Sequence, residues 1–300
     1  MSIINYKLKR VKDCEMYNEA GKINACWFYL TDSNYYLQLD DVKLFEYKTK
    51  ISKEYNLKSP YVDYYLSRLL EDIFEILQDI AYPMPYDLYK LMDTEEKYSN
   101  LDNKLKDWYY ETENANQKFS DFFEHHIEHD ISKPDPKKES DFELLGNKYL
   151  WLGEMCTSYL DPGFNCKFLH VENDLFIHYN CLVFDENCWT AKKGIFTIPF
   201  EEFIIEIELL LNNFFSDMDK QVFEAINFLK DDEYSYTNFP PDYIKKYPEK
   251  APVKIGAEYL IEENENRKKD FFNILKEVRE KSKVYKLYWN EVREKLNLIK

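Results

Sequence analysis

The clearest hydrophobic pattern lies in residues 59–88, where apolar side chains recur three and four positions apart from Val62 onward. This is the period of a helix with one buried face. Pro60 suits the first helical position because its missing N–H would have no partner there. Pro83 and Pro85 cannot continue a helix. The sequence therefore predicts one long core helix that begins at Pro60 and ends before these prolines.

Four polar residues form a candidate recessed site on or near this helix. Asp63 projects among apolar neighbours, where a carboxylate needs a partner. Either the free N–H groups of the first turn hold it or it belongs to a site. Arg68 and Asp72 are four apart and suit an i,i+4 ion pair. A carboxylate pair such as Asp63 with Asp72 or Glu154 could also act as an acid and base, if folding brings the two together.

A second core helix is predicted after Pro199, because apolar residues again recur at helical spacing from Phe203 to Leu229. Residues 256–298 are predicted to form a C-terminal helical segment of mixed charge, broken near Ser282. Both helices offer an apolar face that can pack on a sheet.

Short strands are predicted before each long helix, separated by turn residues such as Glu172-Asn173-Asp174. They are residues 3–12, 27–30, 35–39, 42–47, 149–152, 166–171, 175–179 and 189–198. The sequence therefore predicts an α+β fold with antiparallel sheets, two long amphipathic core helices and a C-terminal helical segment.

Changes in composition divide the chain into four segments. Residues 1–93 form a strand meander with a core helix, and residues 94–143 an acidic helical insertion. Residues 144–230 add strands and the second core helix, and residues 231–300 a connector rich in Pro and Tyr followed by the C-terminal helices. The segments make up either one compact unit or two packed halves.

Several blocks of residues resemble an uncharacterised bacterial family, known only as a domain of unknown function. The likeness covers most of residues 25–230, with no counterpart for residues 94–143 and 231–300, and with Met155 where arginine is expected. It implies no catalytic residues, and it suggests a cytosolic bacterial protein with an immunity or defence role. The blocks are Trp27-Phe28-x-Leu30-Thr31-Asp32-x-x-Tyr35, Pro60-Tyr61-Val62-Asp63-Tyr64-Tyr65, Arg68-Leu69-x-Glu71-Asp72, Pro83-x-Pro85-x-Asp87-Leu88, Trp151 with Glu154, Tyr159-Leu160, and Trp189-Thr190-Ala191 with Gly194.

The net charge of −16 is uneven along the chain. Residues 1–12 are basic and residues 254–300 slightly so, which leaves residues 13–253 with a charge of −23. Such a field repels nucleic acid and anionic membranes, and it speeds the capture of basic proteins. We expect a basic protein partner, no nucleic acid and no membrane.

The six cysteines show no metal-binding or redox spacing, and the chain shows no secretory signal or membrane-spanning run. Reduced thiols and a cytoplasmic location are therefore expected.

The insertion at 94–143 contains 14 acidic and 7 basic residues and a group of aromatic side chains. Aromatic anchors surrounded by carboxylates suit the capture of a basic protein. The predicted interaction surface consists of Asp107, Trp108, Tyr109, Tyr110, Glu111 and Glu113.

The histidines suggest metal binding as an alternative to protein binding. His125 and His129 are four apart, with Asp121 one turn earlier, so the three could share a divalent metal on one helix face. The order differs from H-E-x-x-H, and a solvated helix face is the preferred interpretation. His170 and His178 flank a predicted hairpin and could approach one another, although sheet histidines with satisfied hydrogen bonds are preferred.

These patterns predict a cytoplasmic protein-binding module, similar to an immunity protein, that neutralises a basic partner such as a toxin. No cofactor is expected. A metal-dependent enzyme using His125 and His129, or a non-catalytic component of a defence or signalling complex, remains an alternative. The sequence leaves the oligomeric state open.

Overall fold

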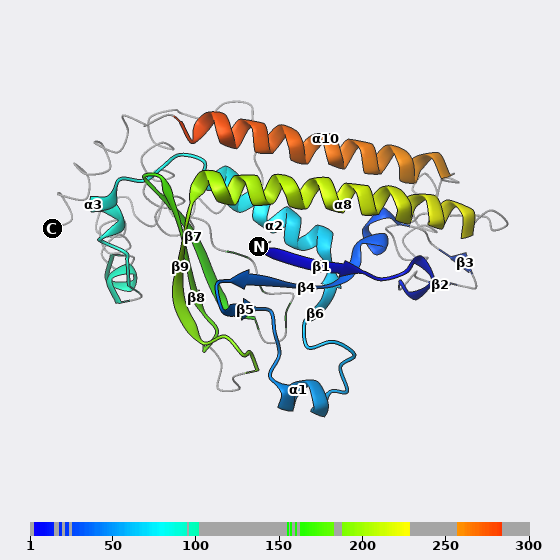
Figure 1. Ribbon diagram of the computed structural model, residues 1–300, viewed down its shortest axis with the longest axis horizontal. Coiled ribbons are helices and arrows are strands. Elements are labelled where there is room, and N and C mark those ends of the chain that lie inside the picture. Colours follow the sequence, from blue (N-terminus) through cyan, green and yellow to red (C-terminus); the bar gives the residue numbers. More distant parts are fainter. Residues whose placement is uncertain are drawn as a thin grey trace, which may run out of the picture.

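The computed structural model confirms an α+β fold with antiparallel sheets and long helices (Figure 1). It describes residues 3–14, 18–19, 22–23, 26–94, 96–101, 155, 157, 160, 163–182, 188–228 and 257–283. The strands are β1 (Ile4–Leu8), β2 (Asn18–Glu19), β3 (Lys22–Ile23), β4 (Asp32–Leu39), β5 (Val42–Leu44), β6 (Val62–Tyr65), β7 (Asn165–Val171), β8 (Asp174–Asn180) and β9 (Lys193–Pro199). The helices are η1 (Val11–Asp13), η2 (Trp27–Thr31), α1 (Thr49–Glu54), α2 (Leu66–Asp79), α3 (Tyr86–Tyr89), α8 (Phe200–Phe228) and α10 (Ala257–Lys281), of which η1 and η2 are 3-10 helices.

The first sheet is built around β4, which pairs antiparallel with β1, β5 and β6. β5 pairs with the second half of β4, and β6 pairs with the first half. Side chains of a strand alternate between faces. Tyr35, Leu37 and Leu39 are buried on the inner face, and the outer face carries polar and partly exposed residues.

The prediction that the first core helix begins at Pro60 is wrong, because the helix begins at Leu66. The preceding residues, Val62–Tyr65, form β6 and satisfy their backbone groups by pairing with β4. Ser59 accepts the N–H of Tyr61 through its Oγ, at 3.2 Å, within a turn. At the true start, the Thr31 hydroxyl accepts the N–H of Ser67 at 3.4 Å, so a residue distant in sequence serves the first turn.

The expected strand at residues 27–30 is also wrong, because Trp27–Thr31 is a 3-10 helix. Trp27 and Leu30 are both buried. A spacing of three places two such side chains on one side of a 3-10 helix, and this helix therefore anchors the entry to β4.

The second sheet has the strand order β7-β8-β9 and confirms the predicted hairpin. Its turn lies at Glu172 and Asn173, and Glu172 has a positive φ of 55°. The strand predicted at residues 189–198 is present as β9. β9 continues directly into α8, which is the helix expected after Pro199.

Helices α8 and α10 run side by side across the top of Figure 1, with α2 behind them and the two sheets below. α10 confirms the predicted C-terminal helix over residues 257–281. Within the described part of the chain, no helix has the length and apolar character needed to cross a membrane.

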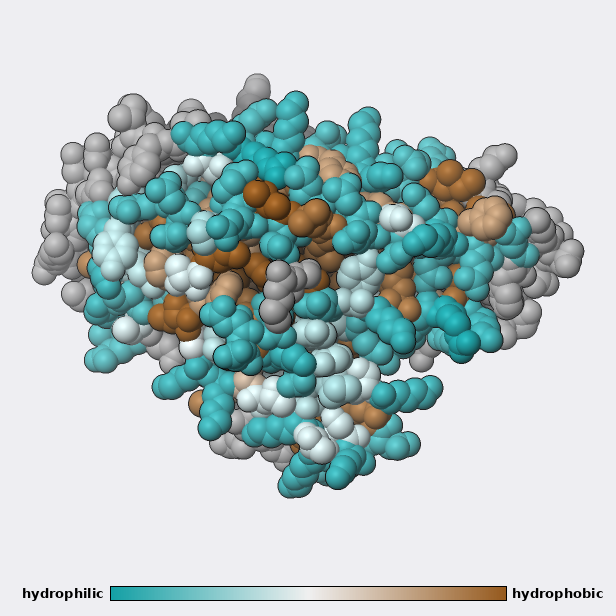
Figure 2. All heavy atoms as spheres, in the orientation of Figure 1, coloured by the Kyte–Doolittle hydropathy of each residue, from teal (hydrophilic) through white to brown (hydrophobic). Residues whose placement is uncertain are grey.

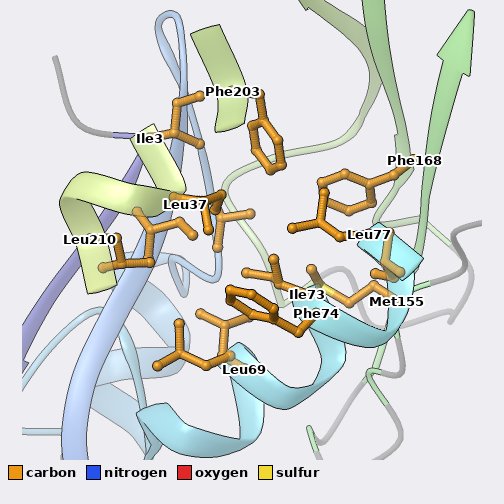
Figure 3. Packing of buried hydrophobic residues seen from close by; sticks show 14 of the residues in the cluster. Ile3, Leu37, Leu69, Ile73, Phe74, Leu77, Met155, Phe168, Phe203 and Leu210 are labelled. Atoms are coloured by element: carbon orange, nitrogen blue, oxygen red, sulfur yellow. The ribbon is translucent and has the colours of Figure 1, made fainter. Parts of the chain in front are cut away.

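Buried residues from both sheets and from α2, α8 and α10 form one hydrophobic cluster. In the close view of Figure 3, Ile73, Phe74 and Leu77 of α2 point toward Phe203 of α8 and Phe168 of β7. The two long amphipathic helices thus act as the predicted core helices.

Candidate protein-binding surface

Asp63 lies on the outer face of the first sheet, contrary to the expectation that it would lie on the buried side of a helix. It is part of β6, and its side chain is 51% exposed. Its carboxylate pairs with the Lys9 ammonium at 2.5 Å. In the structure, Asp63 of β6 therefore forms an ion pair with Lys9, which directly follows β1.

The side chain of Lys9 contacts residues in two of the sequence blocks that show the family resemblance. Its Nζ donates to Asp32 at 3.0 Å and contacts Asp63, so the Thr31-Asp32 and Val62-Asp63 blocks meet at one cation. Partial burial disfavours the charged amine, yet the hydrogen bonds to Asp63 and Asp32 raise the pKa of Lys9. The Asp32 side chain is only 7% exposed, which makes Lys9 its charge partner in a largely dry position.

The two ion pairs of Lys9 should differ in their effect on stability. Replacing Lys9 by methionine is expected to lower the free energy of unfolding by about 1–3 kcal/mol, because the charge of buried Asp32 loses its cation. Replacing exposed Asp63 by asparagine should cost less than about 1 kcal/mol. Urea unfolding of both variants tests this, and equal losses would contradict the assignment of Asp32 as the buried partner.

Two of the remaining recessed-site candidates, Arg68 and Asp72, lie on helix α2. Arg68 forms an ion pair with Glu71 at 3.3 Å, and Asp72 is buried on α2. Asp63 and Asp72 thus lie in different environments. Glu154, the aromatic interaction group at residues 107–113 and the metal candidates Asp121, His125 and His129 lie outside the described residues.

The two described histidines lie on opposite faces of the second sheet, so they do not approach one another. His170 is buried and His178 is partly buried. His170 Nδ1 lies 3.0 Å from the carbonyl oxygen of Ile80, and its ring stacks on Phe200. His178 Nε2 lies 3.0 Å from the Tyr89 hydroxyl. Among the residues that the structure describes, no group of histidine, cysteine and carboxylate side chains could hold a metal, and the five described cysteines are free thiols.

Polar contacts hold α10 against the body. Trp27 donates its indole N–H to Asn264 at 2.9 Å, and Asn264 donates to Asp219 of α8 at 2.7 Å. Arg267 lies over the Trp27 ring and donates to Glu71. At the other end of α10, Arg279 donates to Glu208 at 2.7 Å. The inner side of α8 and its contact with α10 are thereby fixed, which defines the side of α8 that remains open.

The open side of α8 combines carboxylates with large apolar side chains. Ile205, Leu209 and Phe223 are 44%, 52% and 70% exposed. At about 100° per residue they fall on one side of the helix, away from its buried stripe. We call this surface the α8 outer stripe, and its exposed members are Glu202, Ile205, Leu209, Asn212, Asn213, Ser216, Lys220, Phe223, Glu224 and Asn227.

Helix α8 is also strongly acidic, with seven carboxylates and one lysine among its 29 residues. Several of these carboxylates have partners inside the protein, since Glu208 binds Arg279 and Asp217 accepts from Tyr6. Glu202 and Glu224 have no ion-pair partner in the described part of the chain. Figure 2 shows hydrophobic atoms among hydrophilic ones along the course of this helix.

Sequence reasoning missed this surface because it assigned α8 wholly to the core. The signal was present, since Ile205, Leu209 and Phe223 do not fall on the stripe that contains Phe203 and Phe214. An amphipathic helix that only packs on a core has polar residues at such positions. Apolar residues there leave an exposed apolar surface on α8.

Comparison with known proteins identifies the family but no activity. No curated protein and no solved structure matches the chain. A family model described as a family of unknown function (DUF5984) matches residues 3–295. This match is wider than the 25–230 range of the resembling blocks. It includes the segment at 94–143 and residues 231–295 of the segment at 231–300, neither of which had a counterpart in the resemblance. Because it spans nearly the whole chain, the protein belongs to this family of unknown function.

Proposed function

We propose that the protein binds a basic protein partner through the α8 outer stripe, in the manner of an immunity protein that neutralises a toxin. The observation that carries the proposal is the exposure of Ile205, Leu209 and Phe223 on one side of a helix with seven carboxylates. Apolar contacts supply most of the affinity at such surfaces, and surrounding charge steers the encounter.

The charge of the chain supports a basic partner. A net charge of −16 attracts cationic proteins over distances up to about the Debye length, about 8 Å at physiological ionic strength. Within the stripe, Glu202 and Glu224 lie close to the exposed apolar residues and are available to lysine or arginine of a partner. A bacterial, cytoplasmic setting for this interaction is part of the same proposal.

Capture from the native host tests the proposal. We expect the wild-type chain to retain a basic protein that the double variant Ile205→Ser/Leu209→Ser loses, because the variant removes apolar contact area and leaves the charge unchanged. The matched control is Tyr55→Ser/Leu57→Ser, directly after α1, where the side chains are 66% and 39% exposed.

The expected outcome is loss of the partner from the stripe variant and retention by the control. A partner retained equally by both variants would place the binding surface elsewhere. A captured partner that is acidic would contradict the charge argument.

A further inference from the structure

Strand β9 is an open edge of the second sheet. The opposite edge, β7, is covered at both ends, because Met84 donates to the carbonyl of His170 and Met155 donates to that of Cys166. β9 pairs with β8 along its full length. In the described part of the chain, no strand pairs with its other side.

The pairing pattern shows which backbone groups point outward. Cys181 donates to the carbonyl of Lys192, and Phe200 donates to that of Asn173. Hydrogen-bonded pairs alternate along an antiparallel ladder, so the even-numbered residues of β9 bond to β8. The N–H and C=O groups of Lys193, Ile195 and Thr197 therefore point away from the sheet, and all three residues are exposed.

This edge has little of the protection that sheet edges ordinarily carry. Natural edges are blocked by charged residues, bulges or prolines. The five residues from Gly194 to Ile198 are uncharged, and the register with β8 continues from Lys193 to Pro199 without a bulge. Ile195 is 53% exposed. The edge is thus a flat template for another strand.

We propose that β9 pairs antiparallel with β9 of a second copy, about a two-fold axis at Phe196, to give a symmetric dimer with a continuous sheet. This inference goes beyond the proposed function and rests on the edge of β9, which shares only Glu202 with the α8 outer stripe. An axis at Phe196 places Ile195 opposite Thr197 of the second copy, so the outward groups of each can bond to the other. It is an isologous interface, in which the same residues serve both copies.

The charges at the two ends of β9 favour this antiparallel partner. Lys192 and Lys193 lie at its start, and Glu201 and Glu202 follow its end. All four side chains are exposed. Antiparallel pairing brings the lysines of one copy toward the glutamates of the other, whereas a parallel arrangement would place like charges together.

Molar mass measured by light scattering over a range of protein concentrations tests the dimer. The wild type is expected to be a dimer that Thr197→Pro converts to a monomer, because proline removes an outward N–H that the fold itself does not use. Circular dichroism of the monomeric variant confirms that the fold is retained. Lys193→Glu should raise the dimer dissociation constant at least about tenfold, and adding Glu201→Lys should restore it.

Either of two results would overturn the inference. A wild type that stays monomeric at every concentration would show that a second copy does not occupy this edge, and would leave it to a strand of another protein. A dimer that survives Thr197→Pro, or a Lys193→Glu dimer that the second charge reversal does not restore, would place the contact on another surface.

Discussion

Lowering the pH from 7 to 5 is expected to reduce the free energy of unfolding by about 4 kcal/mol, because buried His170 and partly buried His178 are held neutral in the fold. Burial lowers the pKa of His170 to about 4, against hydrogen bonds to the backbone that act in the opposite direction. Burial also lowers the pKa of His178 to about 4. The charge of Asp93 acts to raise this pKa, and the charge of Lys167 acts to lower it.

The loss of stability at lower pH follows from the difference in proton binding between the folded and the unfolded chain. The ordinary pKa of 6.5 applies in the unfolded chain, which therefore binds more protons than the fold between pH 6.5 and 4. The stabilisation is fully present above the unfolded pKa and is lost as the pH falls toward 4. Each histidine contributes about 2 kcal/mol of the change between pH 7 and 5.

Urea unfolding at the two pH values measures this loss. Replacing His178 by glutamine should remove about half of the pH dependence, because the remaining half belongs to His170. Carboxylates titrate mainly below this range and should contribute little. Equal stability of the wild type at pH 7 and pH 5 would show that the two histidines are not held neutral.

Replacing Trp27 by alanine is expected to cost about 3–5 kcal/mol of stability. Trp27 is 1% exposed and packs edge-on against Phe214 of α8. Its removal leaves a cavity and also leaves Asn264, which is 3% exposed, without its indole donor. Thermal or urea unfolding should therefore show both a large loss and a looser attachment of α10, detectable as faster amide exchange in that helix.

Phe223→Ala is the matched control, because Phe223 is an aromatic residue of α8 with 70% of its surface exposed. Its replacement should change stability by less than about 0.5 kcal/mol. Comparable losses in the two variants would contradict the assignment of Trp27 to the core and of Phe223 to the exposed side of α8.

Elements set by local pattern were predictable from sequence. Helix α8 was predicted from its period, and the β7-β8 hairpin from its turn at Glu172-Asn173. Both depend on neighbours in the chain, since a helix needs only its own i,i+4 bonds and a hairpin needs only a tight turn.

Residues 60–65 show why elements that depend on contacts distant in sequence were not predictable. Their apolar spacing is compatible with a helix, and Pro60 is a good first helical residue. The deciding interaction is pairing with β4, more than twenty residues earlier in the chain, which satisfies the backbone of Val62–Tyr65 as a strand. For the same reason Asp63 lies on an exposed strand face and not on the buried side of a helix. Its partner Lys9 directly follows strand β1.

The α8 outer stripe was not predicted from the sequence, because helix α8 was assigned wholly to the core. Composition indicated an acidic surface with large apolar or aromatic residues, and the α8 outer stripe has that character. The insertion at 94–143 lies largely outside the described residues, so its own aromatic group stays a prediction.

The central claim is that the α8 outer stripe binds a basic protein, and the affinity of the captured partner tests it most directly. Titration calorimetry with the purified partner should show a dissociation constant at least about tenfold higher for Ile205→Ser/Leu209→Ser than for the wild type, with the α1 control unchanged. Equal affinity of the wild type and the stripe variant would contradict the claim.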